Sequence, residues 1–315
     1  MEVLRGSVKF PVLCLFFIAI AISCARIGPR AIRADITHKG TILDEDLAEV
    51  SGIAVSRIRD DTLWVINDSG NSASVYALDS KGERICTLNI QGVANNDWED
   101  IASFEYEGNA YLLIADVGDN FARRSRCFLH FVEEPDLREA RETPCLLSAK
   151  PSWSITYAYE DGPRDCESVA VDAAGGKILL LSKRDIPPVL YELPLTKEKN
   201  AVAEKCAVIG PLPRRAADNS RFWKNSNQPT AMDISADGLF AVVLTYSSAF
   251  RFTRKRSTDW TEAFMTPPKE IPIPALQQAE SICLSRDGKD IYITSEQLPA
   301  PLIRFTLRYG GDPHE

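Results

Sequence analysis

The sequence has few histidines and no closely spaced cysteine pair. Only three histidines occur among its 315 residues, at positions 38, 130 and 314, and no CxxC spacing is present. These absences disfavour a histidine-rich zinc site and a zinc cluster built from paired cysteines. A Ser–His–Asp triad is disfavoured as well, because none of the three histidines falls near the acidic positions described below.

A basic surface and the common nucleotide-binding fingerprints are also missing. Acidic residues outnumber basic ones by 44 to 36, which gives a formal net charge of −8. Nucleic-acid binding favours a concentrated basic surface, so we expect no nucleic-acid partner. The sequence contains no P-loop and no dinucleotide-binding glycine pattern.

One apolar run stands at the N-terminus. Phe10 to Ile22 follow Arg5 and Lys9 and precede Ser23-Cys24. A basic start, a short apolar stretch and small residues predict a secretory signal over residues 1–24, and residues 21–24 are similar to a lipobox with Cys24 as the lipidated residue. The alternatives are an ordinary cleaved signal and a retained anchor. We expect an exported, cell-envelope protein, held at the outer membrane by its lipid, with residues 25–32 as a linker.

Six cysteines lie beyond residue 24, at positions 86, 127, 145, 166, 206 and 283. In an oxidising compartment one or two disulfides are expected, and Cys127 and Cys145 are the nearest pair in sequence. Buried free thiols are the alternative.

Five segments of the chain begin alike, and this internal repeat predicts the fold. They are residues 51–55, 99–103, 167–171, 230–234 and 280–284, each a short apolar strand opened by a polar residue. Each is followed by turn residues and a second β-rich strand, and third strands follow in all five units. Fourth strands follow in four units, at 83–90, 152–159, 203–210 and 269–274.

The fifth unit ends after its third strand, and residues 33–43 at the other end of the chain supply the missing partner. We therefore predict an all-β protein, a β-propeller of five four-stranded blades over residues 33–315, closed by an N-terminal strand that leaves no open edge. A sixth blade is the alternative, because residues 136–150 remain unassigned. A β-sandwich would not explain the repeated opening.

In a propeller, the first strand of each blade lines the axis and the second runs antiparallel beside it. The start of one and the end of the other then lie on the same face. The starts supply Ser51, Glu99, Glu167, Thr230 and Glu280; the ends supply Asp68, Asp116, Lys183, Tyr246 and Glu296, each 16 or 17 residues later. The pattern predicts a ring of carboxylates around one mouth of the channel.

Crowded carboxylates repel one another and need compensation, which a calcium ion with its six to eight oxygen ligands provides. We expect Glu99, Glu167 and Glu280 as ligands first, and Asp68, Asp116 and Asp119 second. For any one of them, a turn or a backbone hydrogen bond is the alternative role. Lys183 and Arg184 are expected to offset charge or to hold an anionic substrate, with Tyr246 beside them.

Several segments resemble exported bacterial propellers of the phytase-like or esterase-like kind, and are similar also to the SdiA-regulated type. The most specific are Asn96–Ala102 (NDWEDIA) and Ala115–Asn120 (ADVGDN), and the resemblance runs over about residues 45–300. It implies calcium held by Glu99, Asp100, Glu167 and Glu280. By analogy with lactonase-type propellers, it also implies a single calcium held by Glu99 or Glu280 with Asn67 and Asp116.

Two functions follow from this reading. The first is a calcium-dependent hydrolase of phosphoesters or esters, in which Asp68 or Glu296 accepts the proton of a metal-activated water. The second is a non-catalytic envelope lipoprotein that binds a small polar or anionic ligand or a protein at the same face. In either case we expect a monomer.

Overall fold

A computed structural model of the chain describes residues 32–139, 143–210, 212–213, 227–274, 276 and 278–309. The predicted signal segment, Cys24 and nearly all of the predicted linker lie outside these residues. Among the described residues, no helix is both long enough and apolar enough to cross a membrane.

The strands form five four-stranded antiparallel units in chain order. The first is β2 (Val50–Val55), β3 (Thr62–Asn67), β4 (Ser74–Asp79) and β5 (Arg84–Ile90); the second is β6 (Trp98–Tyr106), β7 (Asn109–Asp116), β8 (Cys127–Glu133) and β10 (Trp153–Tyr159); the third is β11 (Cys166–Asp172), β12 (Lys177–Ser182), β13 (Val189–Pro194) and β14 (Asn200–Val208); the fourth is β15 (Pro229–Ile234), β16 (Phe240–Thr245), β17 (Ala249–Thr253) and β18 (Lys269–Ile271); the fifth is β19 (Ala279–Leu284), β20 (Asp290–Ser295), β21 (Ala300–Tyr309) and β1 (Ile32–Ile42).

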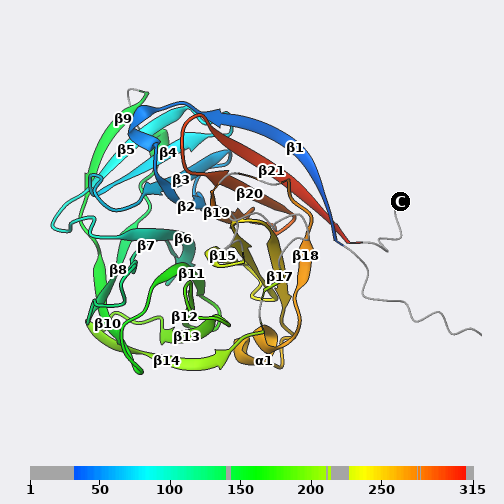
Figure 1. Cartoon of the computed structure of the whole chain (residues 1–315). Helices are drawn as coiled ribbons and strands as arrows, with labels where there is room; N and C mark the ends of the chain where they lie inside the picture. Colours follow the sequence, from blue (N-terminus) through cyan, green and yellow to red (C-terminus); the bar gives the residue numbers. More distant parts are fainter. Residues whose placement is uncertain are drawn as a thin grey trace, which may run out of the picture. The chain divides into compact units, whose positions relative to one another are not determined.

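The innermost strands close into a ring. β2 lies beside β6, β6 beside β11, β11 beside β15, β15 beside β19, and β19 beside β2 again. Figure 1 shows these five strands at the centre, with β1, β10, β14 and β18 at the periphery. The arrangement is a five-bladed β-propeller, as the sequence predicted.

The N-terminal strand completes the last blade. β1 pairs antiparallel with β21 over nearly its whole length, from Ile32 opposite Tyr309 to Ile42 opposite Ala300. Pairing the first strand with the last joins the two ends of the described chain and leaves no gap in the ring. The predicted closing strand is therefore confirmed.

Five apolar clusters fill the spaces between neighbouring blades. One lies between the first and second blades and contains Trp64, Ile66 and Leu112; another, between the first and fifth, contains Val65 and Leu302. Successive residues of one strand therefore face different neighbours, as the period-2 alternation of a strand requires. Both faces of each sheet are buried, which explains why these strands are apolar almost throughout.

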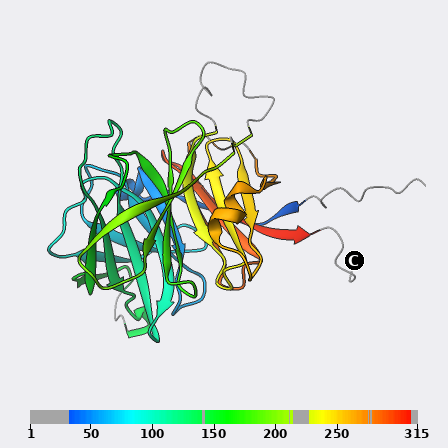
Figure 2. The ribbon, with the colours of Figure 1, turned by 90° about the horizontal axis from the view of Figure 1, so that it is seen from below.

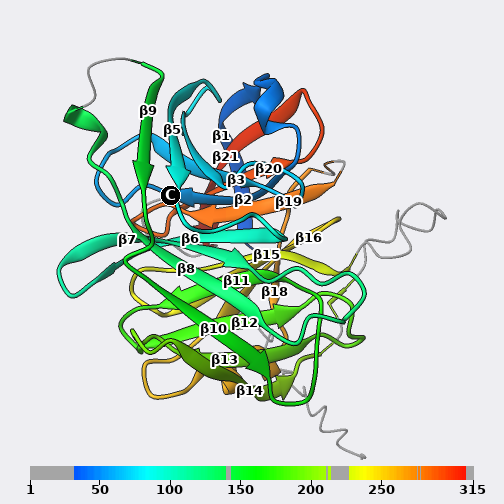
Figure 3. The same cartoon turned by 90° about the vertical axis from the view of Figure 1, so that its left-hand side faces the viewer.

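The blades also contact one another at their outer edges. β10 pairs in parallel with β14 and so joins the second and third blades into one eight-stranded sheet. Residues 136–150, the candidate for a sixth blade, instead form the short helix η2 (Leu137–Glu139) and the strand β9 (Cys145–Ala149). β9 adds a fifth strand to the first blade by parallel pairing with β5 (Figure 3).

The disulfide differs from the pair that the sequence suggested. Cys86 of β5 is bonded to Cys145 of β9, directly opposite it in register. Cys127 is a buried free thiol on β8, like Cys166 and Cys283, whereas Cys206 is half-buried and free. Nearness in sequence misled here, because the parallel pairing of β9 brings together cysteines 59 residues apart.

Two further short helices lie outside the blades. η1 (Glu45–Leu47) precedes β2, and the side chain of Asp44 caps it by accepting the backbone N–H of Asp46. α1 (Trp260–Met265) begins after Asp259, whose side chain accepts the N–H of Glu262. α1 packs against β14 and β17 on the outer rim (Figures 1 and 2).

Candidate metal centre at the acidic mouth

One residue near the start of every innermost strand lies at a break in the strand register. The breaks fall between Val50 and Gly52, Trp98 and Asp100, Cys166 and Ser168, Pro229 and Ala231, and Ala279 and Ser281. The residues at the breaks are Ser51, Glu99, Glu167, Thr230 and Glu280, the five equivalent positions found in the sequence. A β-bulge redirects the side chain that it carries, so the same irregularity sets this position in all five blades.

Two of these five side chains bind backbone. Ser51 Oγ donates to the carbonyl of Trp98 at 2.8 Å, and Thr230 Oγ1 donates to the carbonyl of Ala279 at 2.9 Å. Each hydroxyl thus ties its blade to the next. The other three positions carry the buried carboxylates of Glu99, Glu167 and Glu280.

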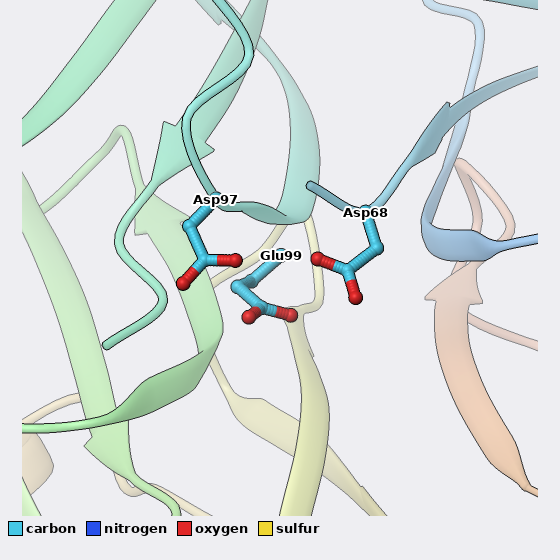
Figure 4. A group of neighbouring side chains, drawn as sticks. All are labelled: Asp68, Asp97 and Glu99. Carbon is cyan, nitrogen blue, oxygen red and sulfur yellow. The ribbon is translucent and has the colours of Figure 1, made fainter. Parts of the chain in front are cut away.

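Glu99 lies in a first group of carboxylates with Asp68 and Asp97. One oxygen from each lies within 4.8 Å of the others. Figure 4 shows the three carboxylates turned toward one another, with Glu99 between Asp97 and Asp68. Asp68 follows β3 and Asp97 precedes β6, so two neighbouring blades contribute to the group.

Glu99 also belongs to a second group, with Asp165 and Glu167. Their oxygens again lie within 4.8 Å of one another, and all three residues are buried. Three residues predicted at the acidic mouth, Asp68, Glu99 and Glu167, are thus members of these groups, and their role as metal ligands stays a prediction. Asp97 and Asp165 are members that the sequence pattern did not indicate. Each stands two residues before a predicted ligand, and in extended chain residues i and i+2 point to the same side.

Gly118 provides the space for this arrangement. A Cβ atom at this position would lie 2.2 Å from Glu99 Oε1 and 2.6 Å from Asp97 Cγ. The glycine in the Asp116–Asp119 segment is thus required by the approach of two carboxylates to the backbone, and not by an unusual backbone conformation.

Two cations of the third blade neutralise part of the second group. Lys183 Nζ forms a buried ion pair with Glu167 Oε1, and it lies 5.1 Å from the centre of the Tyr246 ring. Arg184 Nε lies 2.5 Å from Asp165 Oδ2, and its Nη2 contacts Asn120 Oδ1. Both predicted substrate-binding cations are thus engaged with carboxylates of the mouth.

Burial and mutual repulsion raise the pKa values of these acids. Desolvation, then the charges of Glu167 and Asp68, raises the pKa of Glu99 well above 4.5. Desolvation raises the pKa of Glu167 to about 7, although Lys183 opposes the shift. For Asp97, desolvation and Asp68 raise the pKa to about 6. Without a cation, the ionised group is therefore under electrostatic strain.

Glu280 and Glu296 lie beside this group and belong to neither set of three. Burial raises the pKa of Glu280 well above its usual value, and Glu167 adds to the shift. Glu296 is half-buried and accepts a hydrogen bond from Gln278 Nε2 at 2.8 Å. Desolvation, with a contribution from Asp68, raises the pKa of Glu296 to about 7.

The predicted ligands Asp100 and Asp116 have other partners. Asp100 Oδ2 accepts the N–H groups of Val169 and Met232, and its Oδ1 accepts that of Ile101. Asp116 accepts hydrogen bonds from Arg124 Nη2 and Asn96 Nδ2, one at each oxygen. Among the described residues, neither belongs to a group of three carboxylates that could hold a metal; each is instead oriented by the donors named above.

Asp119 and Asn67, two secondary candidates, are also held by backbone. Asp119 Oδ2 accepts the N–H of Arg124 at 2.6 Å, while its own N–H donates to Asp165 Oδ1 at 3.0 Å. Asp119 therefore positions a member of the second group. Asn67 Nδ2 donates to the carbonyl of Asp46.

No protein-family model matches the chain, and no curated protein matches it significantly. Among solved structures, the chain is similar to the β-propeller domain of Cps50 (Swd1) from Myceliophteria thermophila. The two share 14% identity with a TM-score of 0.39, over 83% of this chain and 67% of that one. The β-propeller assignment follows from the strand pairing described above; membership of the phytase-like family stays a prediction.

Proposed function

We propose that this propeller binds calcium at the acidic mouth, with Glu99 as the central ligand. The observation that carries the proposal is the membership of Glu99 in two groups of three carboxylates, Asp68–Asp97–Glu99 and Glu99–Asp165–Glu167. Oxygen donors only, flexible in number and drawn from several loops, suit calcium better than a transition metal. Water and backbone carbonyls would complete the coordination sphere.

The charge balance supports a cation at this place. Of the five carboxylates in the two groups, Glu167 and Asp165 form ion pairs, with Lys183 and Arg184. Arg124, which is paired with Asp116, acts on Asp97 only through its charge. The first group, Asp68–Asp97–Glu99, has no ion pair of its own among the described residues. A divalent ion there would relieve the repulsion that raises the pKa values of Asp97 and Glu99.

Calcium titration of the purified chain tests this proposal. Loss of the shared ligand in Glu99→Gln is expected to weaken calcium binding about 100-fold, since it removes one charged ligand from both groups. The matched control is Glu262→Gln, at an exposed position on α1, which is expected to bind like the wild type. A wild-type chain that binds no calcium, or a Glu99→Gln variant of unchanged affinity, would contradict the proposal.

Hydrolysis of a phosphoester or ester is the reaction we propose for this site. A bound calcium ion supplies Lewis acidity toward the scissile group and lowers the pKa of a bound water. Asp68, one of the two predicted proton acceptors, belongs to the first group of three carboxylates and would itself be a calcium ligand. Glu296 lies outside both groups, and its pKa of about 7 suits a general base near neutral pH. We therefore assign the base to Glu296.

A panel of phosphomonoesters, lactones and carboxylic esters tests the reaction. We expect turnover that a chelator abolishes and that Glu296→Gln lowers by about 100-fold or more in kcat, with calcium affinity nearly unchanged. The exposed Glu83→Gln variant is the control. Turnover that survives the chelator, or a Glu296→Gln enzyme of full activity, would contradict this assignment.

Ligand binding without catalysis is the second candidate function. The observation that favours it is that Lys183 and Arg184 already form ion pairs with Glu167 and Asp165. Neither cation is then free to hold the anionic group of a substrate. Tight calcium binding combined with no turnover across the panel would support it over hydrolysis.

We further propose that the chain is exported and anchored through Cys24. The Cys86–Cys145 disulfide supports this, because such bonds persist in oxidising compartments. Metabolic labelling with a fatty acid, followed by membrane fractionation, tests the anchor. Wild-type chain should carry label in the membrane fraction, and Cys24→Ser should carry none; equal labelling of both would contradict the proposal.

A further inference from the structure

A second cavity lies at the end of the ring opposite the acidic mouth. Its volume is about 430 Å³, and residues that follow or end the innermost strands line it, among them Arg57, Ser103, Asp172, Ser235 and Arg286. Because every innermost strand begins at the acidic mouth, the ends of these strands define the other face. A cavity of this size accommodates a small molecule.

Two carboxylates on innermost strands lie between the two mouths, Asp100 buried and Asp233 partly buried. Asp100 on β6 accepts N–H groups from β11 and β15, and Asp233 on β15 accepts the N–H of Leu284 on β19 at 2.8 Å. Both residues thus bind the inner edges of strands from other blades.

Arg57 lines this cavity and has no ion pair among the described residues. Its Nε and Nη2 donate to the carbonyl of Ser103 at 3.0 and 2.7 Å, and Nε also contacts Ser103 Oγ. Its charge acts on the carboxylate of Asp233 and lowers the pKa of that group, which burial raises. The guanidinium is thus oriented by the Ser103 carbonyl and is not held in an ion pair that a ligand would have to displace.

Arg286 adds a second guanidinium to the wall. Its Nε donates to the carbonyl of Ser56 at 2.7 Å, which fixes its direction. Within the described part of the chain it forms one ion pair, with Asp60, whose side chain is 90% exposed. Exposed pairs of this kind are weak and exchange readily with other anions.

The acidic residues of the wall do not cancel these two charges. Asp172 is committed elsewhere: it accepts from Trp260 Nε1 at 2.8 Å and from the N–H of Gly175 at 2.9 Å, and it lies 3.5 Å from Arg254 Nη2. Glu105 is exposed at the edge. Neither of these two acids forms an ion pair with Arg57 or Arg286 among the described residues, and Asp233 is the carboxylate on which the charge of Arg57 acts.

We propose that this cavity is a second binding site, specific for a phosphomonoester group held by Arg57 and Arg286. The planar guanidinium pairs with phosphate oxygens through two parallel hydrogen bonds, and two such groups match a dianion better than a monoanion. Ser103 and Ser235 also line the cavity, but their hydroxyls donate to the carbonyl of Val55 and to Asp237 Oδ1, so the two guanidinium groups are the donors that we assign to the ligand.

Calorimetric titration of the calcium-free chain with inorganic phosphate and with phenyl phosphate tests this site. Wild type should show saturable binding at millimolar concentration or below, and acetate should bind more weakly. Arg57→Gln should weaken phosphate binding about tenfold, and Arg57→Lys should retain part of it. Arg59→Gln, the same change at an exposed neighbour that does not line the cavity, should bind like the wild type.

Three outcomes would overturn the proposal: no saturable phosphate binding by wild type up to about 10 mM, unchanged affinity in Arg57→Gln, or loss of binding in Glu99→Gln, which would place the phosphate at the acidic mouth. If Arg57→Gln does not fold, modification of wild-type Arg57 by phenylglyoxal provides a second measurement. Phosphate should protect Arg57 and leave Arg59 reactive; equal reactivity with and without phosphate would overturn the proposal as well.

Discussion

The carboxylate of Asp100 accepts the backbone N–H of Val169, 69 residues further along the chain, at 2.8 Å. The innermost strand of each blade has one edge without a neighbour in its own sheet, and buried N–H groups on such an edge need an acceptor. Asp100 supplies it for β11 and also for Met232 on β15. A residue that resembled a metal ligand in the sequence thus holds three blades together.

Replacement of Asp100 by asparagine is expected to destabilise the fold. The amide keeps one acceptor oxygen where three N–H groups converge, and its own NH₂ faces donors. We expect a loss of about 1–3 kcal/mol in the free energy of unfolding, measured by denaturant titration. Asp61→Asn, at an exposed turn with positive φ that asparagine tolerates, should change it little. Equal stability of the two variants would refute the bracing role of Asp100.

The repeat predicted the architecture well because each blade buries both faces in the same way. Strands such as Phe240–Thr245 are apolar up to their last residue, and the polar residue that opens each first strand falls at the same bulge in every blade. The N-terminal closing strand could be predicted because the fifth unit lacked a partner.

The details of the site were harder to predict, because they depend on side-chain direction. Asp116 and Asp97 both lie at the acidic mouth. Asp116 accepts a hydrogen bond from Arg124, whereas Asp97 lies beside Glu99. No strand pattern distinguishes the two. The sequence offered one indication of these two members: Asp97 and Asp165 each stand two residues before a predicted ligand, Glu99 and Glu167. The Cys86–Cys145 bond depended on the parallel pairing of β9, which has no signature in the sequence.

Substitution of Gly118 by alanine is expected to weaken calcium binding. The added methyl group would lie 2.2 Å from Glu99 Oε1, so the carboxylate must move away from the groups that it joins. We expect a calcium affinity at least about tenfold lower by calorimetry. Gly210→Ala, where a Cβ meets nothing within 4 Å, is the matched control. An unchanged affinity in Gly118→Ala would mean that Glu99 does not need its present position.

Loss of the Cys86–Cys145 disulfide is expected to lower stability. The bond closes a loop of 59 residues, and loop-closure entropy predicts a contribution of about 4 kcal/mol. We expect Cys145→Ser to lower Tm, and the β9 segment to become sensitive to protease. Cys206→Ser, which removes a half-buried free thiol, should have a much smaller effect. Wild-type Tm in Cys145→Ser would indicate that pairing of β9 with β5 suffices without the bond.

The raised pKa values at the acidic mouth predict that the stability of the calcium-free chain falls as pH rises, whereas the stabilisation by calcium grows. The folded-state pKa is about 7 for Glu167 and for Glu296, above the ordinary value of 4.5. Between these values the folded chain binds more protons than the unfolded chain, so its stability decreases as pH rises through this window. We therefore expect the Tm of the calcium-free chain to be higher at pH 5 than at pH 7.5. Calcium needs the ionised carboxylates, so the Tm increase on adding calcium should be larger at pH 7.5. Glu99→Gln should lose most of that increase. A calcium effect on Tm that is equal at both pH values would show that the ion binds away from these acids.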